Sequence, residues 1–329
     1  MILVTGATGF IGRTLIRQLA ETGYPLRALL RPSHRSPRLP VGVSVEAAVV
    51  SLADTRGLRA AMSDVDVIFH LASAESQGRN ANLLLTDIRG TLNLAEAAAD
   101  AGVQRIIYVS HLGASRGSGY PAFRAKGIAE EHLRRSGVPY TILRSSIVYG
   151  PEDHFTTGLA WMLRNSPGVF LLPGDGQTTL QPLWVEDLVT CMLWSLENPE
   201  TVNQLYEVGG SEYFKVREVL EILMPLVHAR RYLLQMSPAT LRAVTVFCES
   251  FLPGFPASSF WLDYVAVSRT CPADSMPRAF GLMPARFTYR LNYLARKPWY
   301  AGIQATSQRV GSALQERVEK ALELIRSSR

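Results

Sequence analysis

Residues 1–12 read M-I-L-V-T-G-A-T-G-F-I-G, and the prediction of the fold starts from this stretch. The apolar run at 2–4 has no polar alternation, which is typical of a strand buried on both faces of a parallel sheet. Three glycines follow it at three-residue spacing, namely Gly6, Gly9 and Gly12. Residues 13–21 then have the apolar spacing of a helix with one inner side.

A strand, a glycine turn and a helix in this order predict a binding site for the phosphates of a dinucleotide. Glycines let the backbone approach a pyrophosphate, and the free N–H groups at the positive end of the helix hold its charge. The usual fingerprint is G-x-G-x-x-G, whereas this turn has one extra residue in its first gap. A glycine-rich turn without a ligand is the alternative. The residues predicted to contact the cofactor here are Gly6, Thr8, Gly9, Phe10, Ile11 and Gly12.

Strands and helices alternate with short links through residue 150. Apolar runs predict strands at 26–30, 43–50, 65–70, 105–110 and 140–143, and helical spacing predicts helices at 58–62, 82–100 and 121–135. This alternation is typical of an α/β fold, with a doubly wound parallel sheet of the Rossmann type.

The alternation loosens after Gly150. We predict a dinucleotide-binding core over residues 1–150, to which 185–210 return. Residues 151–184 and 211–300 are expected to form a smaller, mostly helical lobe for a substrate or a partner. Residues 301–329 are expected to form an amphipathic helix, with an apolar face made by Val310, Leu314, Val318, Leu322 and Ile325.

The composition narrows the class of protein. The 329 residues carry a net charge of +6, and no run of five Lys or Arg occurs, so nucleic-acid binding is not expected. The three cysteines form no C-x-x-C pair, which predicts neither disulfides nor a metal site. No apolar stretch reaches 18 residues, so no transmembrane segment is expected. We expect a cytoplasmic protein, with contact to a membrane surface left open.

Several short motifs together resemble the extended and atypical short-chain dehydrogenase/reductases. They are T-G-A-T-G-F-I-G at 5–12, H-L-A-S at 70–73, Y-V-S at 108–110, R-A-K at 124–126, Y-G-P at 149–151 and V-E-D at 185–187. The stretches at 150–155, 172–176 and 181–187 are similar to the branch that contains alpha-subcomplex subunit 9 of respiratory complex I, with NmrA-like proteins as neighbours. The resemblance covers residues 1 to about 225 and implies a dinucleotide and a respiratory-complex-like assembly as partners.

The end of the second predicted strand bears on the choice of cofactor. In this fold an Asp or Glu there binds the ribose 2′-hydroxyl of NAD, whereas an Arg pairs with the 2′-phosphate of NADP. The strand ends in Arg31, and His34 and Arg35 follow without an acid nearby. We therefore favour NADP(H) over NAD(H), the alternative being solvated loop arginines. The resemblance adds Asp54 near the adenine and Ala72, Ser73 and Tyr149 near the nicotinamide half.

The resemblance also implies a Ser, a Tyr and a Lys as the catalytic set, with the Tyr four residues before the Lys. Lys126 fits the lysine, which holds the ribose and lowers the pKa of the Tyr. Ala122 occupies the position of the Tyr and has no proton to give. Tyr120 lies six residues before Lys126, just outside the helix start at Pro121.

Four residues stay as candidates for catalysis: Ser110, His111, Tyr120 and Lys126. Ser110 and Lys126 are also expected to contact the cofactor. His111 has the side chain best suited to proton transfer near pH 7, and Tyr149 is a further candidate acid. Three functions remain open. They are a protein with a structural or regulatory nucleotide, an active oxidoreductase or epimerase-like enzyme using His111, Tyr120 or Tyr149, and a membrane-peripheral assembly factor.

Overall fold

The computed structural model describes residues 1–33, 37, 39–251 and 259–295. The predictions on Arg35 and on the amphipathic helix 301–329 lie outside the described residues.

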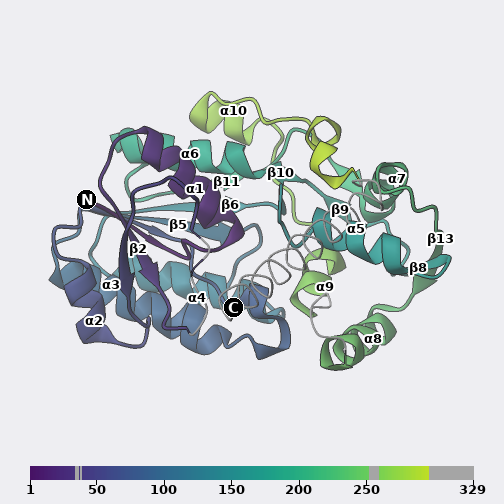
Figure 1. Ribbon diagram of the computed structural model, residues 1–329, viewed down its shortest axis with the longest axis horizontal. Coiled ribbons are helices and arrows are strands. Elements are labelled where there is room, and N and C mark those ends of the chain that lie inside the picture. The colour runs from purple at the N-terminus through teal and green to yellow at the C-terminus, as the bar shows by residue number, and fades with distance from the viewer. Residues whose placement is uncertain (34–36, 38, 252–258, 296–329) are drawn as a thin grey trace, which may run out of the picture.

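A seven-stranded sheet forms the core of the larger lobe, and all its strands run parallel (Figure 1). The order is β11-β6-β5-β4-β1-β2-β3. The strands are β1 (Ile2–Thr5), β2 (Leu26–Leu30), β3 (Glu46–Val49), β4 (Val67–His70), β5 (Arg105–His111), β6 (Tyr140–Ser145) and β11 (Gln204–Val208). The predicted doubly wound sheet of the Rossmann type is confirmed.

Helices cover both faces of this sheet (Figure 1). One face carries α1 (Phe10–Glu21), α6 (Val185–Glu197) and α10 (Ser275–Phe280), and the other carries α2 (Thr55–Ala61), α3 (Gly90–Asp100) and α4 (Pro121–Arg135). Leu15, Leu188 and Met276 are buried in the cluster on the first face. Leu94 and Leu133 are buried in the cluster on the second face.

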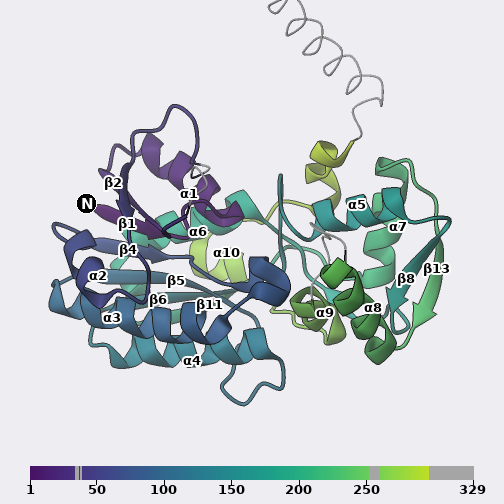
Figure 2. The ribbon, with the colours of Figure 1, turned by 60° about the horizontal axis from the view of Figure 1, so that its bottom comes forward.

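A smaller lobe lies beyond the carboxyl ends of the strands (Figure 2). Its helices are α5 (Thr156–Asn165), α7 (Val216–Leu226), α8 (Pro238–Phe251) and α9 (Ser259–Ala266), with short turns η4 (Phe287–Arg290) and η5 (Asn292–Leu294). Three two-stranded sheets join them: β7 (Val148–Tyr149) with β10 (Leu183–Trp184), β9 (Thr179–Leu180) with β12 (Phe214–Lys215), and β8 (Val169–Pro173) with β13 (Tyr232–Met236). Strand β13 was not predicted from the sequence. Its five residues are extended because they pair with β8, which lies about 60 residues earlier in the chain, and local sequence does not reveal such pairing.

The boundaries of three predicted helices differ from the structure, and α2 covers Thr55–Ala61 where residues 58–62 were predicted. Helix α1 begins at Phe10 rather than at residue 13, so Gly12 lies inside its first turn. A Cβ atom at Gly12 would lie 2.2 Å from the carbonyl oxygen of Gly6, so only glycine allows this close packing. The predicted helix at 82–100 is a π-helical segment, η2 (Leu84–Arg89), followed by α3.

The return of the chain to the core is visible at two places. Strand β11 pairs with β6 along five residues, from Gln204 beside Thr141 to Val208 beside Ser145. A short turn, η3 (Pro199–Thr201), precedes β11. Helix α10 comes back from the smaller lobe and buries Met276 against the core. Among the described residues, no helix is both long and apolar enough to cross a membrane.

Candidate functional site

The glycine turn after β1 is held against the end of β4. Gly6 has a φ of +68°, and a Cβ atom there would lie 2.6 Å from the carbonyl carbon of Leu71. Thr5 Oγ1 accepts hydrogen bonds from the N–H groups of Leu71 (3.1 Å) and Ala72 (3.2 Å). Hydrogen bonds from Thr5 therefore hold the glycine turn beside Ala72, the residue predicted to lie near the nicotinamide half of the cofactor.

The N-terminus of α1 is open to an anion. Gly9 is its N-cap and provides no side-chain hydrogen bond, and the first turn of the helix holds no acidic residue. Thr8 and Gly9 are exposed, while Phe10 and Ile11 are half-buried. Because the first N–H groups of a helix have no intrahelical acceptor, this end fits a pyrophosphate.

The residues predicted near the adenosine lie at the ends of β2 and β3. Arg31 follows β2 directly and is exposed. Asp54 precedes α2, and its Oδ1 accepts a hydrogen bond from the N–H of Gly57 at 2.9 Å. Asp54 is thus the N-cap of α2, and its contact with adenine stays a prediction.

Lys126 is buried beside a carboxylate. Its side chain lies on α4, is 5% exposed, and places Nζ 3.6 Å from Asp87 Oδ1. Burial by itself would lower the pKa of Lys126, but Tyr108, Asp87 and Glu75 outweigh it and raise that pKa. Asp87 Oδ1 is buried without a hydrogen-bond partner among the described residues. An unsatisfied acceptor beside a lysine suits the hydroxyl groups of a ribose, as predicted for Lys126.

Ser110 is engaged on the α4 side of the sheet. Its hydroxyl donates to Glu130 Oε1 at 2.6 Å, and the serine is fully buried. Glu130 also forms ion pairs with Arg144 (2.7 Å) and Arg134 (3.0 Å). In this arrangement the hydroxyl holds α4 against β5, and it is not free to orient a substrate.

His111 forms a close pair with Glu75, which lies in the short helix η1 (Glu75–Asn80). The imidazole Nε2 is 2.9 Å and 3.1 Å from the two carboxylate oxygens, and Tyr264 on α9 donates its hydroxyl to the same carboxylate at 3.3 Å. Burial would raise the pKa of Glu75, but the facing His111 and Lys126 lower it to about 2. The other ring nitrogen of His111, Nδ1, is buried without a partner in the described part of the chain. Ser73 Oγ lies 3.4 Å from Glu75 Oε1.

Tyr120 and Ala122 lie at the start of α4. Tyr120 is the N-cap residue, and the guanidinium of Arg269 lies 4.9 Å from the centre of its ring. The same guanidinium lies 3.7 Å from the centre of the Phe123 ring. Ala122 is 0% exposed. The position one helical turn before Lys126 is therefore filled by a buried methyl group.

Tyr149 lies in the apolar core of the smaller lobe. The ring is 0% exposed and packs against Trp184 (5.3 Å between centroids) and Phe287 (4.9 Å). Burial raises the pKa of its phenol. Core packing accounts for this side chain, and its contact with the cofactor stays a prediction.

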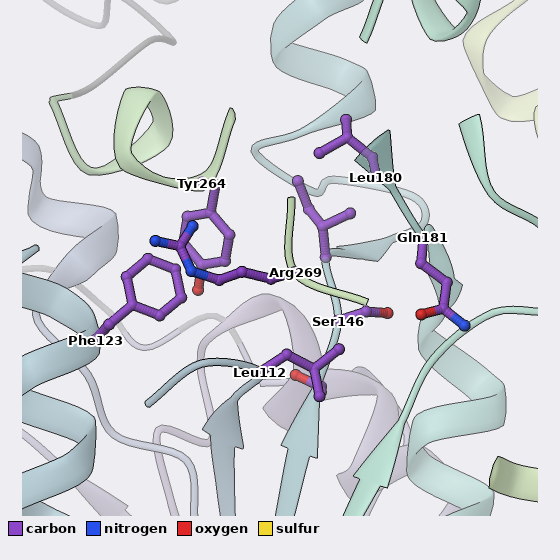
Figure 3. A pocket seen from close by; sticks show the side chains of 9 residues that line it. Leu112, Phe123, Ser146, Leu180, Gln181, Tyr264 and Arg269 are labelled. Carbon is purple, nitrogen blue, oxygen red and sulfur yellow. The ribbon is translucent and has the colours of Figure 1, made fainter. Parts of the chain in front are cut away.

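A small cavity lies where the two lobes meet (Figure 3). Its apolar lining comes from Leu112, Phe123, Ile147 and Leu180, and its polar lining from Ser145, Ser146, Gln181, Tyr264 and Arg269. Its volume is about 20 Å³, which is room for one water molecule. Phe123 and Tyr264 also pack on the ring of His111, so the cavity adjoins the predicted catalytic residues.

Four residues at the site were not found by sequence reasoning: Glu75, Asp87, Tyr264 and Arg269. Asp87 could have been found from its spacing, because it lies four and seven residues before Thr91 and Leu94 and so on the same helical face. The structure shows that this face is buried. Tyr264 and Arg269 lie in the region where the family motifs end, and nothing local marks them. No cluster of three or more potential metal ligands occurs within the described ranges.

Comparison with known proteins agrees with this fold. Residues 6–161 match an NAD(P)H-binding family, and residues 123–209 match the NAD dependent epimerase/dehydratase family. The parallel sheet, the glycine turn at the N-terminus of α1 and the match to an NAD(P)H-binding family together define a dinucleotide-binding protein. The chain belongs to the atypical branch of the NAD(P)-binding short-chain dehydrogenase/reductase family.

Relatives of this chain have different roles. Mitochondrial NADH dehydrogenase (ubiquinone) 1 alpha subcomplex subunit 9 of Arabidopsis thaliana is 31% identical over 68% of this chain and 57% of that protein. Photosystem II assembly factor Ycf39 of Synechocystis is 23% identical over 89% of each. The 2-alkyl-3-oxoalkanoate reductase of Stenotrophomonas maltophilia is 25% identical over 86% of this chain and 94% of that protein. The chain spans 57% to 62% of the length of the complex I subunits that it matches.

Solved structures share the fold at low identity. The NADPH-dependent quinone oxidoreductase of Escherichia coli, complexed with NADPH, has a TM-score of 0.72 and 20% identity, covering 90% of this chain and 100% of that one. The UDP-glucose 4-epimerase of Thermus thermophilus, complexed with NAD, has a TM-score of 0.66 and 21% identity, covering 89% and 97%.

Proposed function

We propose that this chain binds NADP(H) in preference to NAD(H) and keeps it as a structural or regulatory ligand. Gly6, Gly9 and Gly12 would hold the pyrophosphate at the N-terminus of α1, and Lys126 would hold the nicotinamide ribose together with Asp87. A 2′-phosphate would meet Arg31, whose charge has no acidic partner among the described residues. A bare 2′-hydroxyl would find no carboxylate at the end of β2.

The observation that carries the structural role is Ala122. NADPH, when bound, supplies a hydride, and reduction of a carbonyl also needs an acid beside it. One turn before Lys126 there is a methyl group that is 0% exposed, and the Ser110 hydroxyl donates to Glu130. Both groups that would polarise a carbonyl are thus missing or engaged.

Mass spectrometry of protein purified under native conditions tests this proposal. We expect NADPH to co-purify and to remain unoxidised in the presence of a panel of carbonyl compounds. Arg31→Ala should weaken NADPH binding about ten-fold and leave NADH binding unchanged, because one phosphate ion pair is lost. The matched control is Arg17→Ala, an exposed arginine on α1. Purification with NADH, or with an empty site that NADPH does not fill, would contradict the proposal.

A reductase is the second candidate, and the pair formed by His111 and Glu75 favours it. With Nε2–H donated to Glu75, Nδ1 carries a proton only when the ring is an imidazolium. In this candidate the imidazolium gives its Nδ1 proton to the carbonyl oxygen and is left as a neutral imidazole that still donates Nε2–H to Glu75. The 2-alkyl-3-oxoalkanoate reductase among the relatives suggests an oxo acid as substrate. Steady oxidation of NADPH that persists in Tyr120→Phe and disappears in His111→Ala would establish this candidate over the first.

Association with a membrane complex remains the third candidate. Two relatives are named as a complex I subunit and a photosystem II assembly factor. In the smaller lobe, Phe247 on α8 is 63% exposed and Tyr232 on β13 is 84% exposed. A cytoplasmic protein with peripheral membrane contact should partly sediment with membranes and be released by salt or mild detergent. Complete recovery in the supernatant at low salt would count against this candidate.

A further inference from the structure

The cavity between the lobes has two walls of different origin. One wall comes from the carboxyl ends of β5 and β6, where Leu112 and Ser146 follow the strands. The other wall comes from the end of α9 and the segment after it, with Tyr264 and Arg269 (Figure 3). The cavity therefore lies at the edge of the sheet where α/β proteins bind ligands.

Arg269 brings a positive charge to this cavity without a carboxylate of its own. Nη1 donates to the backbone carbonyls of Asp263 (2.9 Å) and Val267 (3.3 Å), and the carboxylate of Asp263 pairs with Arg242 instead. Arg269 forms no ion pair within the described ranges, and burial lowers its pKa. The Nε and Nη2 groups of this half-buried guanidinium have no hydrogen-bond partner in the described part of the chain, and such a group favours an anion beside it.

Ser146 provides a second polar contact on the opposite wall. It is 4% exposed, and its hydroxyl has no hydrogen-bond partner in the part of the chain that the structure describes. Its neighbour Gln181 is satisfied, because Oε1 accepts from the N–H of Cys271 (2.9 Å) and Nε2 donates to the carbonyl of Gly210 (2.8 Å). Ser146 is therefore the lining group that is left to bind a ligand, since buried polar groups are normally paired.

We propose that this cavity is the binding site of a small monocarboxylate with a short apolar body. A single planar guanidinium matches the one charge and the two oxygens of a carboxylate, whereas a phosphate dianion favours more than one cation. Leu112, Leu180 and Phe123 offer an apolar surface to the rest of the ligand. Because the cavity has room for only one water molecule, the ligand can enter only if the Arg269 side chain moves off the Phe123 ring.

This inference rests on the proposed function in one respect, namely that the neighbouring cleft holds NADP(H). The carboxylate site itself is made only of protein side chains, so it is tested with and without NADPH. Isothermal titration calorimetry of the full chain with hexanoate and with hexanamide compares two ligands that have the same apolar chain and differ in charge. The ratio of their dissociation constants gives the contribution of the carboxylate charge. We expect hexanoate to bind and hexanamide to bind at least about ten-fold more weakly.

Three variants locate the site. Arg269→Gln should weaken hexanoate binding about ten-fold or more, and Ser146→Ala should weaken it by a few-fold. Arg278→Gln is the matched control, because Arg278 is an exposed arginine on α10 paired with Asp274. In an NMR titration, the Nε–H resonance of Arg269 should shift with hexanoate in the wild-type chain, which reports on the site even where a variant is unstable.

The outcomes separate this inference from the proposed function. Equal binding of hexanoate and hexanamide, full binding by Arg269→Gln, or no binding to a chain that binds NADPH would each overturn the carboxylate site. Failure of NADPH to bind while hexanoate binds through Arg269 would overturn the proposed function and leave the carboxylate site in place.

Discussion

His70 is a fully buried histidine whose two ring nitrogens both have threonine partners. Nδ1 lies 2.7 Å from Thr5 Oγ1, and Nε2 lies 2.8 Å from Thr91 Oγ1. The ring stacks on Tyr108 at 5.4 Å. Burial, with the nearby charge of Lys126, lowers the pKa of His70 to about 3. The imidazole is thus a neutral link between β4, α3 and the strand that leads into the glycine turn.

This link predicts a loss of stability in mild acid. Below the ordinary histidine pKa of about 6.5 the unfolded chain takes up a proton that the folded chain refuses. The contribution of His70 to the free energy of unfolding should therefore fall by up to about 1.4 kcal/mol per pH unit between pH 6 and pH 4. Urea unfolding of the wild type and of His70→Gln at several pH values measures it. The difference between the two should shrink as the pH falls, and a constant difference would contradict the assignment. His154→Gln, at an exposed histidine, is the control.

At the scale of elements, α4 is fixed to the sheet by Glu130. This fully buried carboxylate accepts from Ser110 on β5 and pairs with Arg144 on β6. The contacts position α4 and, with it, Lys126. They also explain why Ser110 does not face a substrate, since its hydroxyl is part of this attachment.

Removal of Glu130 should therefore destabilise the fold. Glu130→Ala leaves Arg144 without its partner, and breaking a buried ion pair in this way costs about 3 kcal/mol. The neighbouring Glu131→Ala is the control, because Glu131 pairs with the exposed side chains of Arg116 and Arg135 and should cost less than about 1 kcal/mol. Chemical denaturation compares the two. Equal losses for both variants would show that Glu130 does not hold α4.

At the scale of the whole molecule, Glu75 joins the two lobes. It lies after β4 in the core, pairs with His111 on β5, and accepts from Tyr264 on α9 of the smaller lobe. Helices α8 and α9 lie alongside the segment that carries Glu75 (Figure 2). This carboxylate therefore contacts a side chain from each lobe, His111 and Tyr264.

A double-mutant cycle tests this joint. Glu75→Gln and Tyr264→Phe should each lower the free energy of unfolding, and the double variant should lose about 1 kcal/mol less than the sum. Glu46→Gln combined with Tyr264→Phe should be additive, because Glu46 pairs with Arg27 away from the joint. Additivity in both pairs would mean that Glu75 and Tyr264 are not coupled.

The sequence alone determined the parts of the molecule whose cause is local. The strand that begins at Ile2, the glycine turn and the helix that follows it, except for its first three residues, follow from an apolar run, from positions where only glycine fits, and from helical spacing. The same reasoning predicted the Rossmann-type sheet, the ends of α4 at 121 and 135, and the return of β11. The sequence also predicted that Arg31 follows the second strand and that Ala122 lies one helical turn before Lys126, because these positions follow from the bounds of the elements.

Only the tertiary structure decided which polar groups meet. Glu75 is 36 residues from His111 and 189 from Tyr264, and no local pattern predicts such contacts. The same holds for the pairing of β13 with β8 and for the cavity beside Arg269. The physical reason is that side-chain partners depend on how distant elements pack and on the direction of each side chain. Local periodicity fixes only the identity and the face of each element.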